Sequence, residues 1–220
     1  MRANMTRGLR WTWATLGALA CVLVAAYGFV YLRRPFDPGD PFMARFALTG
    51  LAVPMHFFGA SLALLLVPVQ ASATVRRRWP RLHRIGGGLS VGGILAAGAG
   101  GLVMAFGSHR GLATGPAFAM LALTWLVVTA LGVAHVVRGD IAAHRRWMMR
   151  CIALTTSAIT LRLMLPIGAA GLRLPFDTVY IFAAWSCWPV NLLLCEAWLR
   201  RRPRRRTPGA TVPSAGAAIA

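Results

Sequence analysis

Residues 76–106 have the sequence RRRWPRLHRIGGGLSVGGILAAGAGGLVMAF, and this stretch decides the fold. Five arginines lie ahead of an apolar run that extends from residue 85 to residue 106. The run has about the 20 residues that an α-helix needs to cross the hydrocarbon core of a bilayer. A basic segment followed by such a run is typical of a transmembrane helix with a short charged loop at one end.

Apolar runs of this kind occur six times along the 220 residues. The composition agrees, because 57% hydrophobic and 13% charged residues are typical of a membrane protein rather than a soluble domain. The segments between the runs are too short to form a separate soluble core. The sequence therefore predicts an all-α polytopic membrane protein, a bundle of six transmembrane helices. The expected spans are residues 11–32, 49–71, 85–106, 115–137, 149–170 and 178–199.

Three regions are expected along the chain. Residues 1–48 form an N-terminal transmembrane helix and an outer loop, and residues 49–200 form a membrane core of five helices. The first apolar run is about 22 residues long, longer than the core of a signal peptide, so we expect a retained anchor. Residues 201–220 are first basic and then rich in Pro, Ser, Thr, Gly and Ala, which predicts a disordered basic tail.

The distribution of arginine predicts the orientation of the chain. All 24 basic residues are arginine. With a cytoplasmic N-terminus, the inner segments carry 18 arginines and the outer segments carry 5, as the positive-inside rule requires. Both termini are then cytoplasmic. Anionic lipid headgroups are a sufficient partner for the net charge of +19, so nucleic-acid binding is not expected.

Small residues in the third span predict close helix packing. Gly88 and Gly92 form a G-x-x-x-G pair, and Gly93, Ala97 and Gly101 extend the stripe. Because small residues let helix backbones approach closely, we expect this helix at the packing centre of the bundle.

Prolines interrupt several spans and predict kinks. Pro54 and Pro68 lie in the second span, Pro166 in the fifth and Pro189 in the sixth. An interior proline removes a backbone donor and frees the carbonyl four residues earlier. The second and sixth helices are therefore expected to border a cavity, where water or neighbouring groups can satisfy such carbonyls.

Two ionisable residues within spans predict a pocket in the outer half of the bundle. His56 and Arg162 are expected at matching depth, and Trp125 and Trp185 at a comparable level could form its walls. Arginine keeps its charge, and no span places a carboxylate at this depth. The guanidinium of Arg162 therefore needs another partner, which can be an anionic small molecule, a lipid headgroup, carbonyls freed by Pro54 or Pro166, or water. The alternative is that Arg162 extends outward to the interface and His56 bonds to a neighbouring helix.

A second polar cluster is expected at the inner face. Glu196 is expected to neutralise an arginine, and the other members to contact lipid phosphates or one another. A b-type haem held by His83 and His144 is an alternative, whereas no zinc-binding spacing is present. The members are His83, Arg84, His144, Arg145, Asn191 and Glu196.

No arrangement for nucleophilic or acid–base catalysis occurs in the sequence. It contains no Ser/His/Asp constellation and no paired carboxylates. We therefore expect a non-enzymatic protein. His109 and Arg110 lie in an outer loop, where we expect a solvated surface.

Several short segments resemble the bacterial membrane-protein family called domain of unknown function 2306 (DUF2306). The resemblance covers roughly residues 50 to 200 and implies a helical membrane fold. It selects the same polar residues but implies no reaction. The segments are HFFGASLAL (56–64), RLHR (81–84), HRRWMMR (144–150), TLR (160–162) and WPVNL (188–192), together with Glu196.

Three functional hypotheses follow. The first is a membrane protein that binds an anionic small molecule or lipid in the outer-half pocket. The second is a haem-binding electron-transfer protein, and the third is a structural or assembly partner that needs no ligand.

Overall fold

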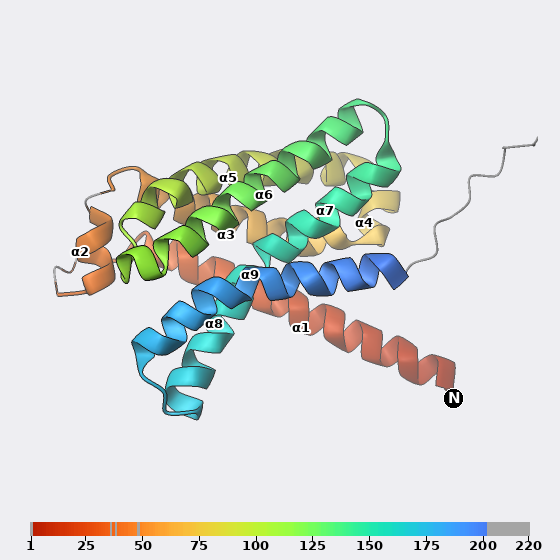
Figure 1. Ribbon diagram of the computed structural model, residues 1–220. Helices are drawn as coiled ribbons and strands as arrows, with labels where there is room; N and C mark the ends of the chain where they lie inside the picture. Colours follow the sequence, from red (N-terminus) through yellow and green to blue (C-terminus); the bar gives the residue numbers. More distant parts are fainter. Residues whose placement is uncertain (1, 36, 38, 48, 202–220) are drawn as a thin grey trace, which may run out of the picture.

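The computed structural model describes residues 2–35, 37, 39–47 and 49–201. Within these residues the chain is helical without a strand, and six helical segments are long and apolar enough to span a membrane (Figure 1). The prediction of an all-α bundle with six spans is confirmed. The predicted disordered tail lies, apart from Arg201, outside the described residues. The elements are α1 (Arg2–Tyr31), α2 (Pro41–Ala47), α3 (Ala52–Ala71), α4 (Ala73–Arg78), α5 (Pro80–Phe106), η1 (Gly111–Ala113), α6 (Gly115–Val137), α7 (Ile141–Thr155), α8 (Ser157–Pro166), η2 (Ile167–Gly171) and α9 (Phe176–Arg201).

The helices run between two ends of the molecule. Helix α2, the α5–α6 loop and the α8–α9 loop lie at one end, which we call the cavity end (Figure 1). Helix α4, the start of α5 and the α6–α7 loop lie at the other, which we call the basic end. The outward faces of the spans expose large apolar side chains, as contact with lipid requires. Examples are Leu95, Leu123, Val127, Leu193 and Leu194.

Helices α5 and α7 begin earlier than the apolar runs predict. Pro80 occupies the first turn of α5, where its missing N–H costs no helical hydrogen bond. The side chain of Asp140 accepts a hydrogen bond from the backbone N–H of Ala143 (2.9 Å) and caps α7. His83 and His144 therefore lie in the first turns of these helices and not, as expected, in loops.

Helices α3 and α5 form the closest helix contact of the bundle. A Cβ on Gly93 would lie 2.8 Å from the carbonyl oxygen of Gly59, and a Cβ on Gly100 would lie 3.0 Å from the backbone nitrogen of His56. By contrast, Gly88 and Gly92 face open space. The predicted packing stripe is thus correct for Gly93 and wrong for the G-x-x-x-G pair.

The fifth span is bent and not one continuous helix. Helix α7 ends at Thr155 and α8 begins at Ser157. The hydroxyl of Thr155 donates to the carbonyl of Cys151 (2.8 Å), that of Thr156 to Ile152 (3.0 Å) and that of Ser157 to Leu154 (2.5 Å). Back-bonding of this kind bends helices.

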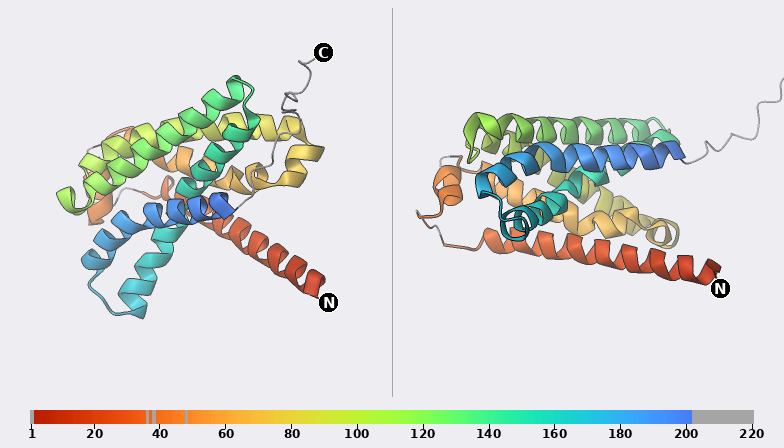
Figure 2. Two further views of the ribbon diagram at one scale, coloured as in Figure 1. Left: turned by 45° about the vertical axis from the view of Figure 1, so that its right-hand side comes forward. Right: turned by 60° about the horizontal axis from the view of Figure 1, so that its bottom comes forward.

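The sixth span has an interior proline, Pro189. Helix α8 and the first half of α9 diverge together from the other helices (Figures 1 and 2). Pro166 ends α8 and is followed by one π-helical turn, η2. Pro54, in contrast, lies in the first turn of α3, where it interrupts no helical hydrogen bond.

Candidate binding cavity

A cavity of about 520 Å³ lies among α1, α3, α5, α6, α7, α8 and α9 toward the cavity end. His56, Trp125 and Arg162 line it, so the structure brings together three of the four residues proposed for the outer-half pocket. The remaining wall is mainly aliphatic and aromatic. It includes Leu121, Leu154, Leu161, Leu165 and Met104.

His56 reaches the cavity from α3. Its Nδ1 lies 2.8 Å from the carbonyl oxygen of Ala97 on α5. Because a carbonyl only accepts, Nδ1 carries the hydrogen and donates it, and in the neutral ring Nε2 is left as an acceptor. A Cβ on Gly101 would lie 3.0 Å from Nδ1, so this glycine provides the space that the imidazole occupies.

Arg162 enters the cavity from α8. Its Nη1 donates to the carbonyl of Ala158, one turn earlier (3.1 Å), and its Cζ lies 5.4 Å from the centre of the Tyr27 ring. Among the described residues no carboxylate forms an ion pair with Arg162. Its carbonyl partner is not one of those that Pro54 or Pro166 was expected to free. The guanidinium is thus directed inward, over an aromatic face, with one backbone hydrogen bond.

Trp125 is fixed in the wall by a buried polar network. Its Nε1 donates to the hydroxyl of Thr155 (3.1 Å), and its carbonyl accepts from the hydroxyl of Thr129 (2.7 Å). The hydroxyl of Thr129 also lies 3.3 Å from the sulfur of Cys151. These bonds hold α6 against α7 next to the cavity.

Trp185 lies outside the cavity, although the sequence analysis placed it there. Its Nε1 donates to the carbonyl of Ala113 in η1 (2.8 Å), and 42% of the residue is exposed. It lies on a face of α9 that turns away from the cavity-lining residues Tyr180 and Cys187. A depth along a helix does not determine which side a residue faces.

Several cavity residues were not foreseen. All three tyrosines of the chain, Tyr27, Tyr31 and Tyr180, line it. Tyr27 and Tyr31 are four residues apart on α1, and this i, i+4 spacing was a usable signal of one polar-tipped helix face. Arg34 and Asp40 also line the cavity, and Asp40 caps α2 by accepting from the N–H of Phe42 (2.8 Å).

The α5–α6 loop packs against α2 and α9 at the cavity end. His109 stacks on Phe42 with ring centroids 4.8 Å apart, and it lies 3.4 Å from the carboxylate of Asp177. Arg110 pairs with the same carboxylate at 3.0 Å. The side chain of His109 is only 20% exposed, so the expectation of a solvated surface is wrong for this residue.

The polar cluster predicted at the inner face separates into parts. Glu196 forms a bidentate ion pair with Arg150. The guanidinium of Arg150 also lies 4.6 Å from the centre of the Trp147 ring. Asn191, on α9, contacts the bend between α7 and α8 and does not lie beside the histidines. Its Nδ2 donates to the carbonyl of Ala153 (3.1 Å), and its Oδ1 accepts from Thr160 (2.9 Å).

The other four members lie at the basic end. His144 donates from Nδ1 to the carbonyl of Gly132 (2.8 Å), whereas Arg84 and Arg145 are exposed. The Nδ1 of His83 is shielded from solvent without a hydrogen-bond partner in the described part of the chain. Neither the cavity described above nor the open depression lined by Arg78, Trp79, Pro80, Arg81 and Leu82 has His83 or His144 among its described lining residues, so these two hollows give the haem hypothesis no support.

Six apolar spans around an interior cavity define a polytopic, α-helical integral membrane protein. The chain matches the family described as "Predicted membrane protein (DUF2306)" over residues 53–199. Because this match covers well over half of the 220 residues, the chain belongs to that family. The matched segment extends from the first turn of α3 into the last turn of α9 and contains His56, Trp125 and Arg162. No curated protein and no solved structure matches the chain.

Proposed function

We propose that this protein binds an amphiphile with an anionic head in the cavity, with the head at Arg162 and the chain along the aliphatic wall. We place the protein in the bacterial inner membrane with both termini in the cytoplasm, so that the cavity lies in the outer half of the bilayer. This orientation follows the distribution of arginine between the loops. Binding and not catalysis is the proposed role.

One observation carries the proposal: Arg162 points into an apolar cavity with no carboxylate partner among the described residues. An arginine at membrane depth is costly unless an opposite charge, carbonyls or water compensate it. The Ala158 carbonyl and the Tyr27 face compensate part of its charge. An anionic head group supplies what the protein itself does not.

The hydrogen bond that His56 already makes limits which head groups can bind beside it. In the neutral ring Nε2 is an acceptor, because Nδ1 donates to Ala97. Next to it, Arg162 provides only donors. A carboxylic acid suits both, since its hydroxyl can donate to His56 while its carbonyl oxygen accepts from Arg162. The deprotonated acid suits the same pair once the imidazole carries the proton.

The size of the cavity fits this ligand class. At about 520 Å³ it falls within the roughly 300–1,000 Å³ of small-molecule sites. Its aliphatic wall offers burial to a hydrocarbon chain, each methylene of which contributes about 0.8 kcal/mol when it leaves water.

Equilibrium binding of radiolabelled hexadecanoate to the purified protein tests the proposal, with hexadecanol as the uncharged control probe. We expect hexadecanoate to bind and Arg162→Leu to weaken binding at least tenfold, because a hydrogen bond to a charged group contributes about 1.5–3 kcal/mol. Arg162→Lys retains the charge and should weaken binding less. Arg173→Leu removes the same charge in the α8–α9 loop, outside the cavity lining, and should change nothing. Equal affinity of wild type and Arg162→Leu for hexadecanoate would overturn the proposal.

A further inference from the structure

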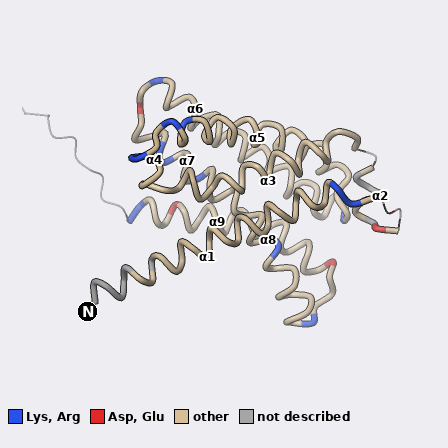
Figure 3. Tube along the Cα trace, turned by 180° about the vertical axis from the view of Figure 1, so that it is seen from behind, with Lys and Arg blue, Asp and Glu red and all other residues tan. Residues whose placement is uncertain are grey.

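A cluster of basic residues lies at the basic end, away from the cavity. It comprises Arg76 on α4, His83 on α5, and His144 and Arg145 on α7. Figure 3 shows the arginines of α4 gathered at one end of the molecule with those at the start of α5 and α7. Three separate helices therefore contribute positive or protonatable groups to one region.

These groups interact with one another. Burial, and after it the charges of Arg145 and Arg77, lower the pKa of Arg76. The His83 ring in turn interacts electrostatically with Arg76 and His144. Positive charges that lie near one another repel, and an anion bound among them offsets this repulsion.

The carboxylates described at this end have other partners. Asp140 caps α7 and lies 3.5 Å from His135. Glu196 is paired with Arg150. Among the described residues, no ion pair balances Arg76 or Arg145.

His83 adds an observation that is independent of charge. Its Nδ1 is shielded from solvent and has no hydrogen-bond partner among the described residues. Gln70 donates to the backbone carbonyl of His83 (3.2 Å), which fixes the start of α5 against the end of α3. Because protein atoms cover Nδ1, the ring nitrogen through which His83 can donate to a ligand is Nε2.

The cluster lies at the level where lipid headgroups are found. It follows directly on the end of the α3 span, and Trp79 and Leu82 next to it are 56% and 49% exposed. Exposed tryptophan at the end of a span is typical of the membrane interface.

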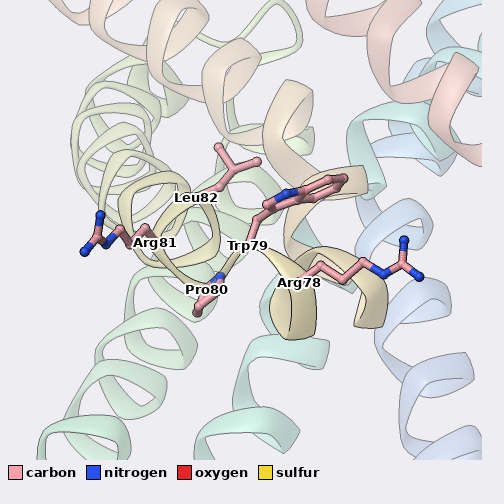
Figure 4. A pocket seen from close by; sticks show the side chains of 5 residues that line it. All are labelled: Arg78, Trp79, Pro80, Arg81 and Leu82. Atoms are coloured by element: carbon pink, nitrogen blue, oxygen red, sulfur yellow. The ribbon is translucent and has the colours of Figure 1, made fainter.

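The open depression at the neighbouring α4–α5 turn is a different feature. It measures about 580 Å³, and Figure 4 shows Arg78 and Arg81 pointing to opposite sides of the turn formed by Trp79 and Pro80. One anion therefore cannot contact both arginines, and Arg78 on α4 is available as a control for Arg76.

We propose that Arg76, His83 and Arg145 bind the phosphate of an anionic phospholipid whose acyl chains lie beside Trp79 and Leu82. The phosphate accepts from the two guanidinium groups and from Nε2 of the His83 ring. This site is independent of the cavity and of its ligand.

Native mass spectrometry of the delipidated full-length protein with phosphatidylglycerol tests the site, and phosphatidylcholine of the same chain length is the comparison lipid. We expect the double variant R76Q/R145Q to bind phosphatidylglycerol roughly 30-fold more weakly, given about 1 kcal/mol per arginine near a membrane surface. The control R78Q/R146Q removes the same charge from the same two helices and should stay within about twofold of wild type. R76K/R145K, which keeps the charge, should lie between them.

The outcomes separate a defined site from diffuse charge. Equal losses in R76Q/R145Q and R78Q/R146Q would overturn the proposal, and so would equal affinity of the wild type for the two lipids. Displacement of phosphatidylglycerol by millimolar inorganic phosphate would show that a soluble anion is the ligand. Hexadecanoate binding by R76Q/R145Q should be unchanged, which keeps this proposal distinct from the one for the cavity and shows that the variant is folded.

Discussion

Arg150 and Arg162 show how one side-chain type is accommodated in two ways within this bundle. Arg150 is partly buried and has the carboxylate of Glu196 and the Trp147 ring as partners. Arg162 has an aromatic face and a backbone carbonyl but no carboxylate among the described residues. Since both guanidinium groups stay charged, the difference marks Arg162, and not Arg150, as the group that can accept an anionic ligand.

At this scale we predict that Glu196→Gln destabilises the protein. Glutamine cannot neutralise Arg150, whose pair with Glu196 has side chains only 21% and 29% exposed. The loss should be roughly 1.5–3 kcal/mol in the free energy of unfolding, seen as a lower midpoint of thermal unfolding in detergent. Asp37→Asn is the control, because Asp37 is exposed and its described bond is to the backbone N–H of Gly39. A midpoint for Glu196→Gln equal to that of wild type would contradict the assignment of a stabilising pair.

Among the elements, α3 and α5 form the contact on which the cavity depends. Their backbones approach closely at Gly59, Gly93 and Gly100. The same approach brings the carbonyl of Ala97 within 2.8 Å of Nδ1 of His56 and thereby sets which ring nitrogen is left as an acceptor. Glycine at these positions therefore acts on both packing and the site.

For this helix pair we predict opposite effects of two neighbouring substitutions. Gly93→Ala would place a Cβ 2.8 Å from the Gly59 carbonyl and should cost about 1–3 kcal/mol, because the backbones must move apart. Gly92→Ala meets nothing within 4 Å and should be neutral or stabilising by up to about 1 kcal/mol, since alanine favours helix. Thermal unfolding of both variants in the same detergent measures the difference. Equal midpoints would show that α3 and α5 are not in close contact at Gly93.

The bends in the last two spans are the other feature at the scale of elements. The hydroxyl groups of Thr155, Thr156 and Ser157 bend the fifth span, and Pro189 lies within the sixth. Asn191 joins the two by bonding to Ala153 and Thr160. Helix α8 and the first half of α9, which diverge from the other helices, carry Arg162 and Tyr180 to the cavity. The bends therefore help to create the cavity.

For the whole molecule, the two ends differ in chemistry. The cavity end carries an aromatic cluster, the Asp177 ion pairs and the cavity residues Arg34 and Asp40. The basic end carries the arginines of α4, α5 and α7 (Figure 3). From the positive-inside rule we propose that the basic end faces the cytoplasm.

The orientation of the molecule can be tested with single cysteines in a background without the four native ones. Leu112→Cys, at an exposed position of η1, should react with a membrane-impermeant maleimide in intact cells whose outer membrane has been permeabilised. Ala142→Cys, exposed near the start of α7, should react only after the inner membrane is opened. The reverse pattern would place the cavity in the cytoplasmic half and contradict the proposed orientation.

Much of the fold could be predicted from the sequence, and the candidate site only in part. Six apolar runs of about 20 residues predict six spans without any tertiary contact, because a segment in lipid must satisfy its own backbone by forming a helix. Depth along the spans likewise suggested that His56, Trp125 and Arg162 share one level. It could not show that Trp185 faces away, or that Asp40 returns from a loop to the cavity.

The amino-acid sequence by itself determined how many runs are long and apolar enough to cross a bilayer, roughly where each run lies and how the charges divide between the two ends. Tertiary structure alone decided which sides of the helices meet. Helices that are apolar all round carry little information about their rotation, so whether Gly93 or Gly92 faces α3, or which arginine meets Glu196, depends on packing between helices. The cavity is a product of that packing together with the two bent spans.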